Sequence, residues 1–286
     1  MPSTLPAPRT IALTVLAMFA FAANSLLCRL ALADASIDPA TFTAIRIASG
    51  VASLWLIVTW RDGRRSTAGS WPAAAALFGY AIAFAVAYVT LSAGTGALIL
   101  FGAVQATMIA IGIFRGERLS ATQLAGLAIA LGGLVLLLAP GATAPSPVGA
   151  VLMALAGMSW GVYSLLGRGA KDPLADTAGN FLRALPMAAL TLALAAAVSS
   201  PVLSAHGVLY AILSGAVASG IGYAIWYAAL PGLSATQGAS VQLSVPVITA
   251  VAAAVMLDEL ISARLVIASV AVLGGIALVI ASRQTR

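Results

Sequence analysis

Ten apolar segments of membrane-spanning length constrain the fold more than any other feature of this sequence. A helix needs about 20 mostly apolar residues to cross the hydrocarbon core of a bilayer. Segments of that size cover 11–32, 39–60, 71–92, 95–114, 120–139, 148–168, 175–199, 206–229, 234–257 and 262–282. Only 8% of the residues are charged, whereas a soluble domain carries about 25%, so this chain cannot cover a water-facing surface. We therefore predict an all-α membrane protein with ten transmembrane helices.

The second half of the chain repeats the first. The matching positions are Glu117 and Glu259, Ser120 and Ser262, and Gly132-Gly133 and Gly274-Gly275, and the members of each pair are 142 residues apart. An offset that stays fixed over many residues indicates two copies of one unit. We predict a first five-helix repeat over 1–139, a linker over 140–147 and a second five-helix repeat over 148–286.

The number of helices in each repeat determines how the two copies cross the bilayer. Because five is odd, the second copy must enter the membrane upside down. Lys and Arg accumulate in cytoplasmic loops. If the N-terminus is cytoplasmic, ten of these cations lie on that side and only Arg264 lies in an external loop. We therefore predict cytoplasmic N- and C-termini and two inverted repeats around a central cavity, an arrangement typical of alternating-access carriers.

The sequence lacks the motifs of catalysis and of metal or phosphate binding. His206 is the only histidine, and neither a metal-ligand cluster nor a glycine-rich phosphate loop occurs. The net charge of +6 comes from short loops and ends, which indicates membrane orientation rather than nucleic-acid binding. We predict no enzyme activity, cofactor, metal, nucleic-acid partner or obligate protein partner. The expected partners are the lipid bilayer and a small-molecule substrate, an amino acid.

All eight acids lie in loops or at the ends of the predicted helices. A carboxylate buried in a membrane helix is the usual proton relay of a pump. Its absence from the helix centres argues against direct proton coupling.

Aromatic and polar residues at mid-helix depth are the candidates for substrate binding. Tyr80, Phe84 and Tyr88 follow one another at four-residue intervals, which places them on one face of the third helix. A Tyr or Trp side chain has an apolar body and a polar tip, and suits an uncharged or zwitterionic solute with an apolar side chain. The alternative is that the aromatics pack between helices and that the amides form interhelical hydrogen bonds. The predicted cavity residues are Asn24, Tyr80, Phe84, Gln105, Trp160, Tyr163, Tyr223, Trp226, Gln242 and Ser244.

Two arginines and a proline inside predicted helices form a second group of candidates. Arg46 and Arg183 are repeat mates, and an arginine within a membrane segment is costly and usually functional. Each could hold a substrate carboxylate; alternatively, each reaches the nearer surface or binds backbone carbonyls. Pro246 removes a backbone hydrogen bond from the ninth helix, where it makes either a gating bend or a static kink. Near the surface, we expect Glu259 to pair with Arg264 or to lie at the N-terminal end of the tenth helix.

These patterns resemble the drug/metabolite transporter superfamily, in its EamA-type branch. The resemblance rests on the five-plus-five repeat and on Glu117…Gly132-Gly133 and Glu259…Gly274-Gly275, and it covers nearly the whole chain. Within that branch, the chain looks most like the YddG-type aromatic amino-acid exporters. The resemblance implies a bacterial inner-membrane location and a central cavity between helices 1, 3, 4, 6, 8 and 9. It also implies that helices 5 and 10 are outer, structural helices.

Three functions are compatible with the sequence. The first is export of neutral amino acids, aromatic ones among them, and related small metabolites by alternating access without direct proton coupling. The second is export of cationic drugs or phosphorylated metabolites. Drugs would need a cavity acid, which is missing, and phosphates would need cavity arginines such as Arg46 and Arg183. The third is a membrane scaffold without flux, although ten helices without a soluble domain offer partners little surface.

Overall fold

The computed structural model describes residues 7–63, 68–114, 116, 118–141, 143–233 and 235–281. Within these ranges, ten helical segments are long and apolar enough to cross a membrane, which confirms the predicted all-α fold with ten transmembrane helices. Six residues used in the repeat and orientation arguments lie outside the described ranges: Arg64, Arg65, Arg115, Glu117, Arg283 and Arg286.

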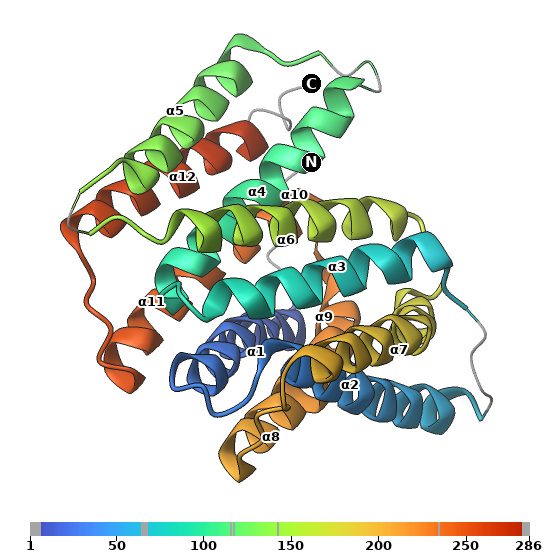
Figure 1. Cartoon of the computed structure of the whole chain (residues 1–286). Helices are drawn as coiled ribbons and strands as arrows, with labels where there is room; N and C mark the ends of the chain where they lie inside the picture. Colours follow the sequence, from blue (N-terminus) through green and yellow to red (C-terminus); the bar gives the residue numbers. More distant parts are fainter. Residues whose placement is uncertain are drawn as a thin grey trace.

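The first five transmembrane helices are continuous, and two of the second five are composite (Figure 1). The first five are α1 (Pro8–Ala33), α2 (Pro39–Asp62), α3 (Trp71–Tyr88), α4 (Ala93–Phe114) and α5 (Ala121–Leu138). The sixth, seventh and tenth are α6 (Pro147–Leu166), α7 (Pro173–Val198) and α12 (Ala263–Ala281). The eighth consists of α8 (Ala205–Ile212), the π-helical η1 (Leu213–Ile221), α9 (Gly222–Ala229) and the 3-10 turn η2 (Leu230–Gly232). The ninth consists of α10 (Ala235–Gln242) and α11 (Ser244–Met256).

Several helix starts are encoded by a capping residue followed by proline. Asp38, Ser146 and Asp172 each precede a proline, and each side chain accepts a hydrogen bond from a backbone N–H three residues later. Such a cap satisfies an N–H that has no partner inside the helix, and proline at the first position needs none. Burial acts to raise the pKa of Asp38, but hydrogen bonds from Thr41 and from the Val202 N–H lower it by more. The pKa of this carboxyl therefore lies below its usual value.

Three helices differ from the prediction by more than three residues at an end or by an internal irregularity. The third ends at Tyr88 rather than at residue 92, because the chain turns over 89–92. The eighth contains η1, a π-helical stretch that the apolar pattern did not indicate. The ninth is interrupted at Leu243, close to Pro246. Because a proline ring clashes with the carbonyl four residues earlier, here that of Gln242, the interruption lies where the proline disfavours a continuous helix.

The transmembrane helices form close pairs (Figure 1). α5 packs along α12, α2 along α7 and α3 along α6, while α1 packs against η1 and α9. Two of these pairs, α2 with α7 and α5 with α12, join helices that hold the same position in the two halves of the chain.

The pair α5–α12 is held by close contacts at single glycines. A Cβ at Gly133 would lie 2.7 Å from the Cβ of Ala271 and 3.0 Å from the backbone nitrogen of Val272. A Cβ at Gly126 would lie 2.6 Å from the carbonyl oxygen of Gly275. The helix backbones can approach this closely only because the glycines have no side chain.

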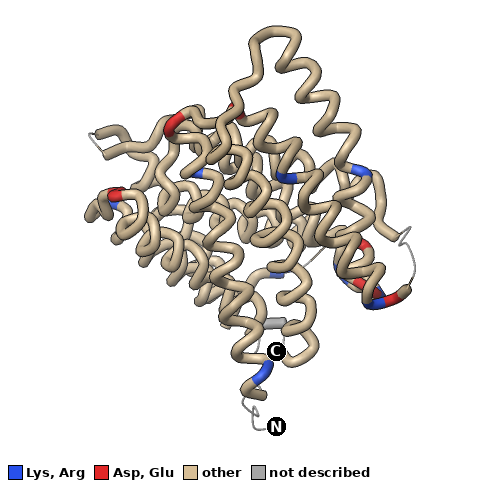
Figure 2. Tube along the Cα trace, turned by 90° about the horizontal axis from the view of Figure 1, so that it is seen from below, with Lys and Arg blue, Asp and Glu red and all other residues tan. Residues whose placement is uncertain are grey.

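The outer surface of the bundle is apolar. Trp60, Phe114 and Val198 are 88%, 90% and 89% exposed, and Figure 2 shows long stretches of helix without a charged residue. Such a surface suits hydrocarbon, since helices satisfy their own backbone hydrogen bonds and need no water there.

Candidate substrate cavity

A cavity of about 580 Å³ lies between the helices of the two halves. It is lined by residues of α1, α3, α4, α6, η1, α9 and α10, as the resemblance implied, and also by residues of α7 and by Ile280 of α12. Nine of the ten predicted cavity residues line it: Asn24, Tyr80, Phe84, Gln105, Trp160, Tyr163, Tyr223, Trp226 and Gln242. The tenth predicted residue, Ser244, is not in the lining that the described residues form. Its hydroxyl donates to the Val241 carbonyl at 2.7 Å within the interrupted ninth helix.

Stacked aromatic rings form one wall of the cavity. The Trp160 ring lies 5.6 Å from that of Tyr223 with an interplanar angle of 21°, and 4.9 Å from that of Tyr80. Trp160 also contacts Tyr163 at 5.2 Å, and Phe21 brings α1 into the same cluster by its contact with Tyr223 at 5.8 Å. Stacked and tilted rings at these distances attract one another, so they form a firm apolar surface that an apolar or aromatic side chain can contact.

Beside this wall lies a buried polar network centred on Tyr80. The Tyr80 hydroxyl oxygen accepts one hydrogen bond from Arg46 Nη2 and another from Asn24 Nδ2, both at 3.1 Å. The carbonyl of Asn24 in turn accepts from the hydroxyl of Ser214, on η1, at 2.7 Å. The network therefore connects α1, α2, α3 and the eighth helix, with Asn24 and Tyr80 in the cavity lining and Arg46 and Ser214 behind them.

Arg46 is buried without a compensating acid. Its exposed fraction is 1%, and its guanidinium lies 5.1 Å and 5.3 Å from the ring centroids of Tyr80 and Phe84. Arg46 Nε and Nη1 have no hydrogen-bond partner in the described part of the chain. Among the described residues, no carboxylate lies within 4 Å of it. The expectation that it reaches the nearer membrane surface is therefore wrong for Arg46.

Arg183 occupies a different environment from its repeat mate. Its Nη1 donates to the carbonyls of Ala68, at 2.6 Å, and Gly179, at 3.0 Å. It lies outside the cavity lining of the described residues. Arg183 thus binds backbone carbonyls, which was one of the two alternatives to carboxylate binding.

The cavity lining also includes polar residues outside the predicted set. Thr177 and Asn180 of α7 line the cavity, as do Ser219 of η1 and Tyr227 of α9. The hydroxyl of Tyr163 donates to Thr177 at 3.2 Å, and the hydroxyls of Thr177 and Tyr227 lie 2.9 Å apart. The spacing of Thr177 and Asn180, on one face of the seventh helix, was an available signal.

The cavity opens at the end of the bundle where α6 ends and α7 begins. Gly167, Arg168 and Gly169 line this mouth and are exposed. α1 begins at the same end, since Thr10 lies against Gly232 of η2.

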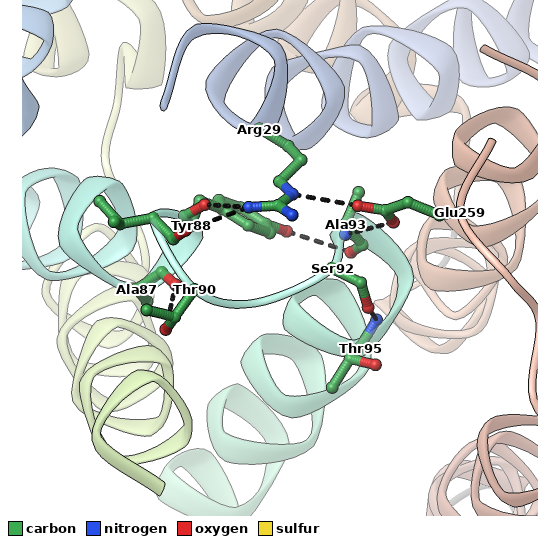
Figure 3. A network of polar contacts seen from close by, with 9 residues as sticks. Arg29, Ala87, Tyr88, Thr90, Ser92, Ala93, Thr95 and Glu259 are labelled. Atoms are coloured by element: carbon green, nitrogen blue, oxygen red, sulfur yellow. Dashed lines mark hydrogen bonds and ion pairs between the residues drawn. The ribbon is translucent and has the colours of Figure 1, made fainter. Parts of the chain in front are cut away.

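At the opposite end, a polar network joins the two halves of the chain (Figure 3). The ring of Tyr88, which is fully buried, packs edge-on against the cavity residue Phe84 at 4.7 Å. Arg29 Nη1 donates to the Tyr88 carbonyl at 3.0 Å, and Arg29 Nε donates to Glu259 at 3.0 Å. Glu259 also accepts from the backbone N–H of Ala93, the first residue of α4, at 2.7 Å. We call Arg29, Tyr88, Ala93 and Glu259 the closing network.

The closing network corrects the expectation for Glu259. This acid pairs with Arg29 rather than with Arg264, and its carboxylate also accepts from the first N–H of α4. Arg264 instead donates to the carbonyls of Ala139 and Pro140. The correct partner is 230 residues away in the chain, so only the packing of α1 beside the turn before α12 could reveal it.

Ten apolar helices around a central cavity that opens at one end define a multi-pass membrane protein built like a small-molecule carrier. The chain belongs to the EamA-like transporter family, whose family model matches residues 8–139 and 147–281. This confirms the resemblance at the level of the family and places the protein in a family of transporters. The narrower likeness to YddG-type exporters stays a prediction.

Two individual proteins are similar to this chain over nearly its whole length. An uncharacterized protein of Pseudomonas aeruginosa is 57% identical over 283 residues, which cover 99% of this chain and 98% of that protein. A crystal structure of another protein matches with a TM-score of 0.65 and 24% sequence identity, covering 94% of this chain and 96% of that one. The second comparison shows a shared fold.

Proposed function

We propose that this protein exports neutral amino acids, aromatic ones among them, and related small metabolites across the bacterial inner membrane, with both termini in the cytoplasm. The observation that carries the proposal is the cavity itself, with an aromatic wall next to a polar network. An amino acid has the same two parts, because an apolar side chain is joined to a small polar head. A pocket that is mostly apolar with a few placed polar groups is typical of small-molecule sites.

Alternating access between two inverted repeats is the mechanism we infer. The same family model matches both halves of the chain. The helix contacts also agree with a twofold axis that relates the two halves. α3 packs on α6, and the helices that correspond to them in the other half, the eighth helix and α1, also pack on each other. The contacts between α5 and α12 follow the same symmetry. Gly133 contacts Ala268, and its repeat mate Gly275 contacts Gly126, which lies 142 residues before Ala268 and is therefore the repeat mate of Ala268. In this structure, the cavity is open at one end while the closing network joins the halves at the other.

We further propose that the solute gradient drives the flux without direct proton coupling. Among the described residues, the cavity lining holds one carboxylate, that of Asp176, beside the mouth. It accepts a hydrogen bond from the Gly69 N–H at 3.1 Å. Asp176 takes no part in the hydrogen bonds of the Tyr80 network, where a proton relay would have to act on the substrate.

Flux measurements in liposomes test the proposal. Purified protein in liposomes preloaded with unlabelled phenylalanine should exchange it for labelled phenylalanine or leucine, and collapse of the pH gradient by an ionophore should leave the rate unchanged. Protein-free liposomes and liposomes with the Trp160→Ala variant serve as controls. The variant should exchange phenylalanine at a reduced rate. Strict dependence on an imposed pH gradient would contradict the uncoupled mechanism. Absence of exchange for every amino acid would contradict the proposed substrates.

The phosphorylated-metabolite alternative loses support from the position of Arg183. That alternative needed two cavity arginines, and Arg183 is engaged by backbone carbonyls away from the lining.

A further inference from the structure

We propose that Tyr80 and Arg46 form an anchor for one carboxylate group, so that substrates of this transporter must carry a carboxylate next to an apolar body. This inference rests on the proposed transport function and adds the chemical class of the substrate. It also assigns a specificity-determining role to Tyr80, with Arg46 behind it.

The hydrogen-bond directions around Tyr80 leave its hydroxyl as a donor toward the cavity. A phenol oxygen has two acceptor positions and one hydrogen. Arg46 and Asn24 fill both acceptor positions, and the Asn24 oxygen in turn accepts from the hydroxyl of Ser214. The hydrogen of Tyr80 finds no acceptor among the described residues, and Tyr80 lines the cavity. A donor whose oxygen already accepts from a guanidinium is polarised, so it binds an anionic oxygen more strongly than a neutral one.

The charge of Arg46 favours an anion at the same place. A buried arginine usually has a carboxylate beside it, because an isolated charge in an apolar interior is costly. The described part of the chain supplies none, and two guanidinium nitrogens remain without hydrogen-bond partners. Only the two aromatic faces of Tyr80 and Phe84 compensate the charge in part. A bound carboxylate would supply the missing counter-charge.

The number of donors selects a carboxylate over a phosphate. One polarised hydroxyl and one guanidinium match a single negative charge. A phosphate monoester carries nearly two charges at neutral pH, but Arg183 donates to Ala68 and Gly179 and Arg168 lies exposed at the mouth of the cavity. The ammonium of an amino acid can lie over the aromatic faces of Trp160 and Tyr223, which attract cations.

Binding of four phenyl compounds to the wild-type protein in detergent, measured by thermal shift, tests the anchor. The probes are L-phenylalanine, 3-phenylpropionate, which lacks the ammonium, 2-phenylethylamine, which lacks the carboxylate, and phenyl phosphate. We expect the two carboxylates to bind at least tenfold more tightly than the other two compounds. Equal or tighter binding of 2-phenylethylamine overturns the anchor, and so does failure of both carboxylates to bind. Tighter binding of phenyl phosphate overturns the choice of a carboxylate.

Two variants and two controls locate the effect. Tyr80→Phe keeps the ring and removes the donor, so carboxylate affinity should fall about tenfold to a hundredfold, as for loss of a hydrogen bond to a charged group, while 2-phenylethylamine is unaffected. Arg46→Gln should abolish the preference for carboxylates. Tyr210→Phe and Arg183→Gln alter a tyrosine and an arginine outside the cavity lining and should retain the preference. An unchanged preference in well-folded Tyr80→Phe protein overturns the proposal even if Arg46→Gln does not fold.

The outcomes separate the anchor from the proposed function. If carboxylates bind selectively but liposomes exchange no amino acid, the anchor stands and the amino-acid function fails. If amino acids are exchanged and 2-phenylethylamine is exchanged as well as phenylalanine, the function stands and the anchor fails.

Discussion

The two glycine pairs provide a sharp test of the packing between α5 and α12, because adjacent glycines have opposite surroundings. A Cβ at Gly133 would meet Ala271 at 2.7 Å, whereas a Cβ at Gly132 would meet nothing within 4 Å. Ordinary van der Waals contact begins at 3.4 Å, so Gly133→Ala forces the helices apart by about 0.7 Å or tilts them. Overpacking of this kind costs about 1–3 kcal/mol. Gly132→Ala has no such cost and gains about 1 kcal/mol of helix propensity.

Melting temperatures of the two alanine variants in the same detergent measure this difference. We expect Gly133→Ala to melt several degrees below Gly132→Ala, with the wild type between them or near the upper value. The repeat mates give an internal replicate, because Gly275 contacts the backbone of Gly126 while Gly274 has open space around it. Equal melting temperatures for the adjacent variants, or the reverse order at either pair, would refute the close packing of these helices.

Three further outcomes are expected. Glu259→Gln removes the charge that pairs with Arg29, so the buried thiol of Cys28 should react several-fold faster with a maleimide; an unchanged rate would show that the closing network does not hold this end. Trp160→Ala should weaken phenylalanine binding about tenfold more than alanine binding, and an equal loss for both would remove the aromatic wall from substrate recognition. The pKa of Asp38 is lowered in the folded protein, so its stabilisation is complete above the unfolded pKa of about 3.9 and is lost as the pH falls through the folded pKa. Melting curves between pH 6 and 3 should therefore decline less steeply in Asp38→Asn than in the wild type, and parallel declines would contradict this.

Much of the cavity could be predicted because the repeat and the helical period act together. The four-residue spacing of Tyr80 and Phe84 put both on one face of α3, and their counterpart helix supplied Tyr223 and Trp226. Ser244 could not be predicted correctly, because its position depends on where the ninth helix is interrupted. Thr177 of α7 was not predicted, because its spacing from Asn180 places both on one helix face but does not show that this face borders the cavity.

The sequence by itself determined the ten helices and their approximate limits, because membrane insertion depends on the local length of apolar segments and local caps such as Asp38 set where helices start. Only the tertiary structure decided the roles of the charged residues. Repeat mates Arg46 and Arg183 have the same local setting, yet one lies behind the cavity and the other binds carbonyls of a neighbouring segment. The physical reason is that a buried charge takes its partners from the helices packed around it, and those helices are distant in the chain.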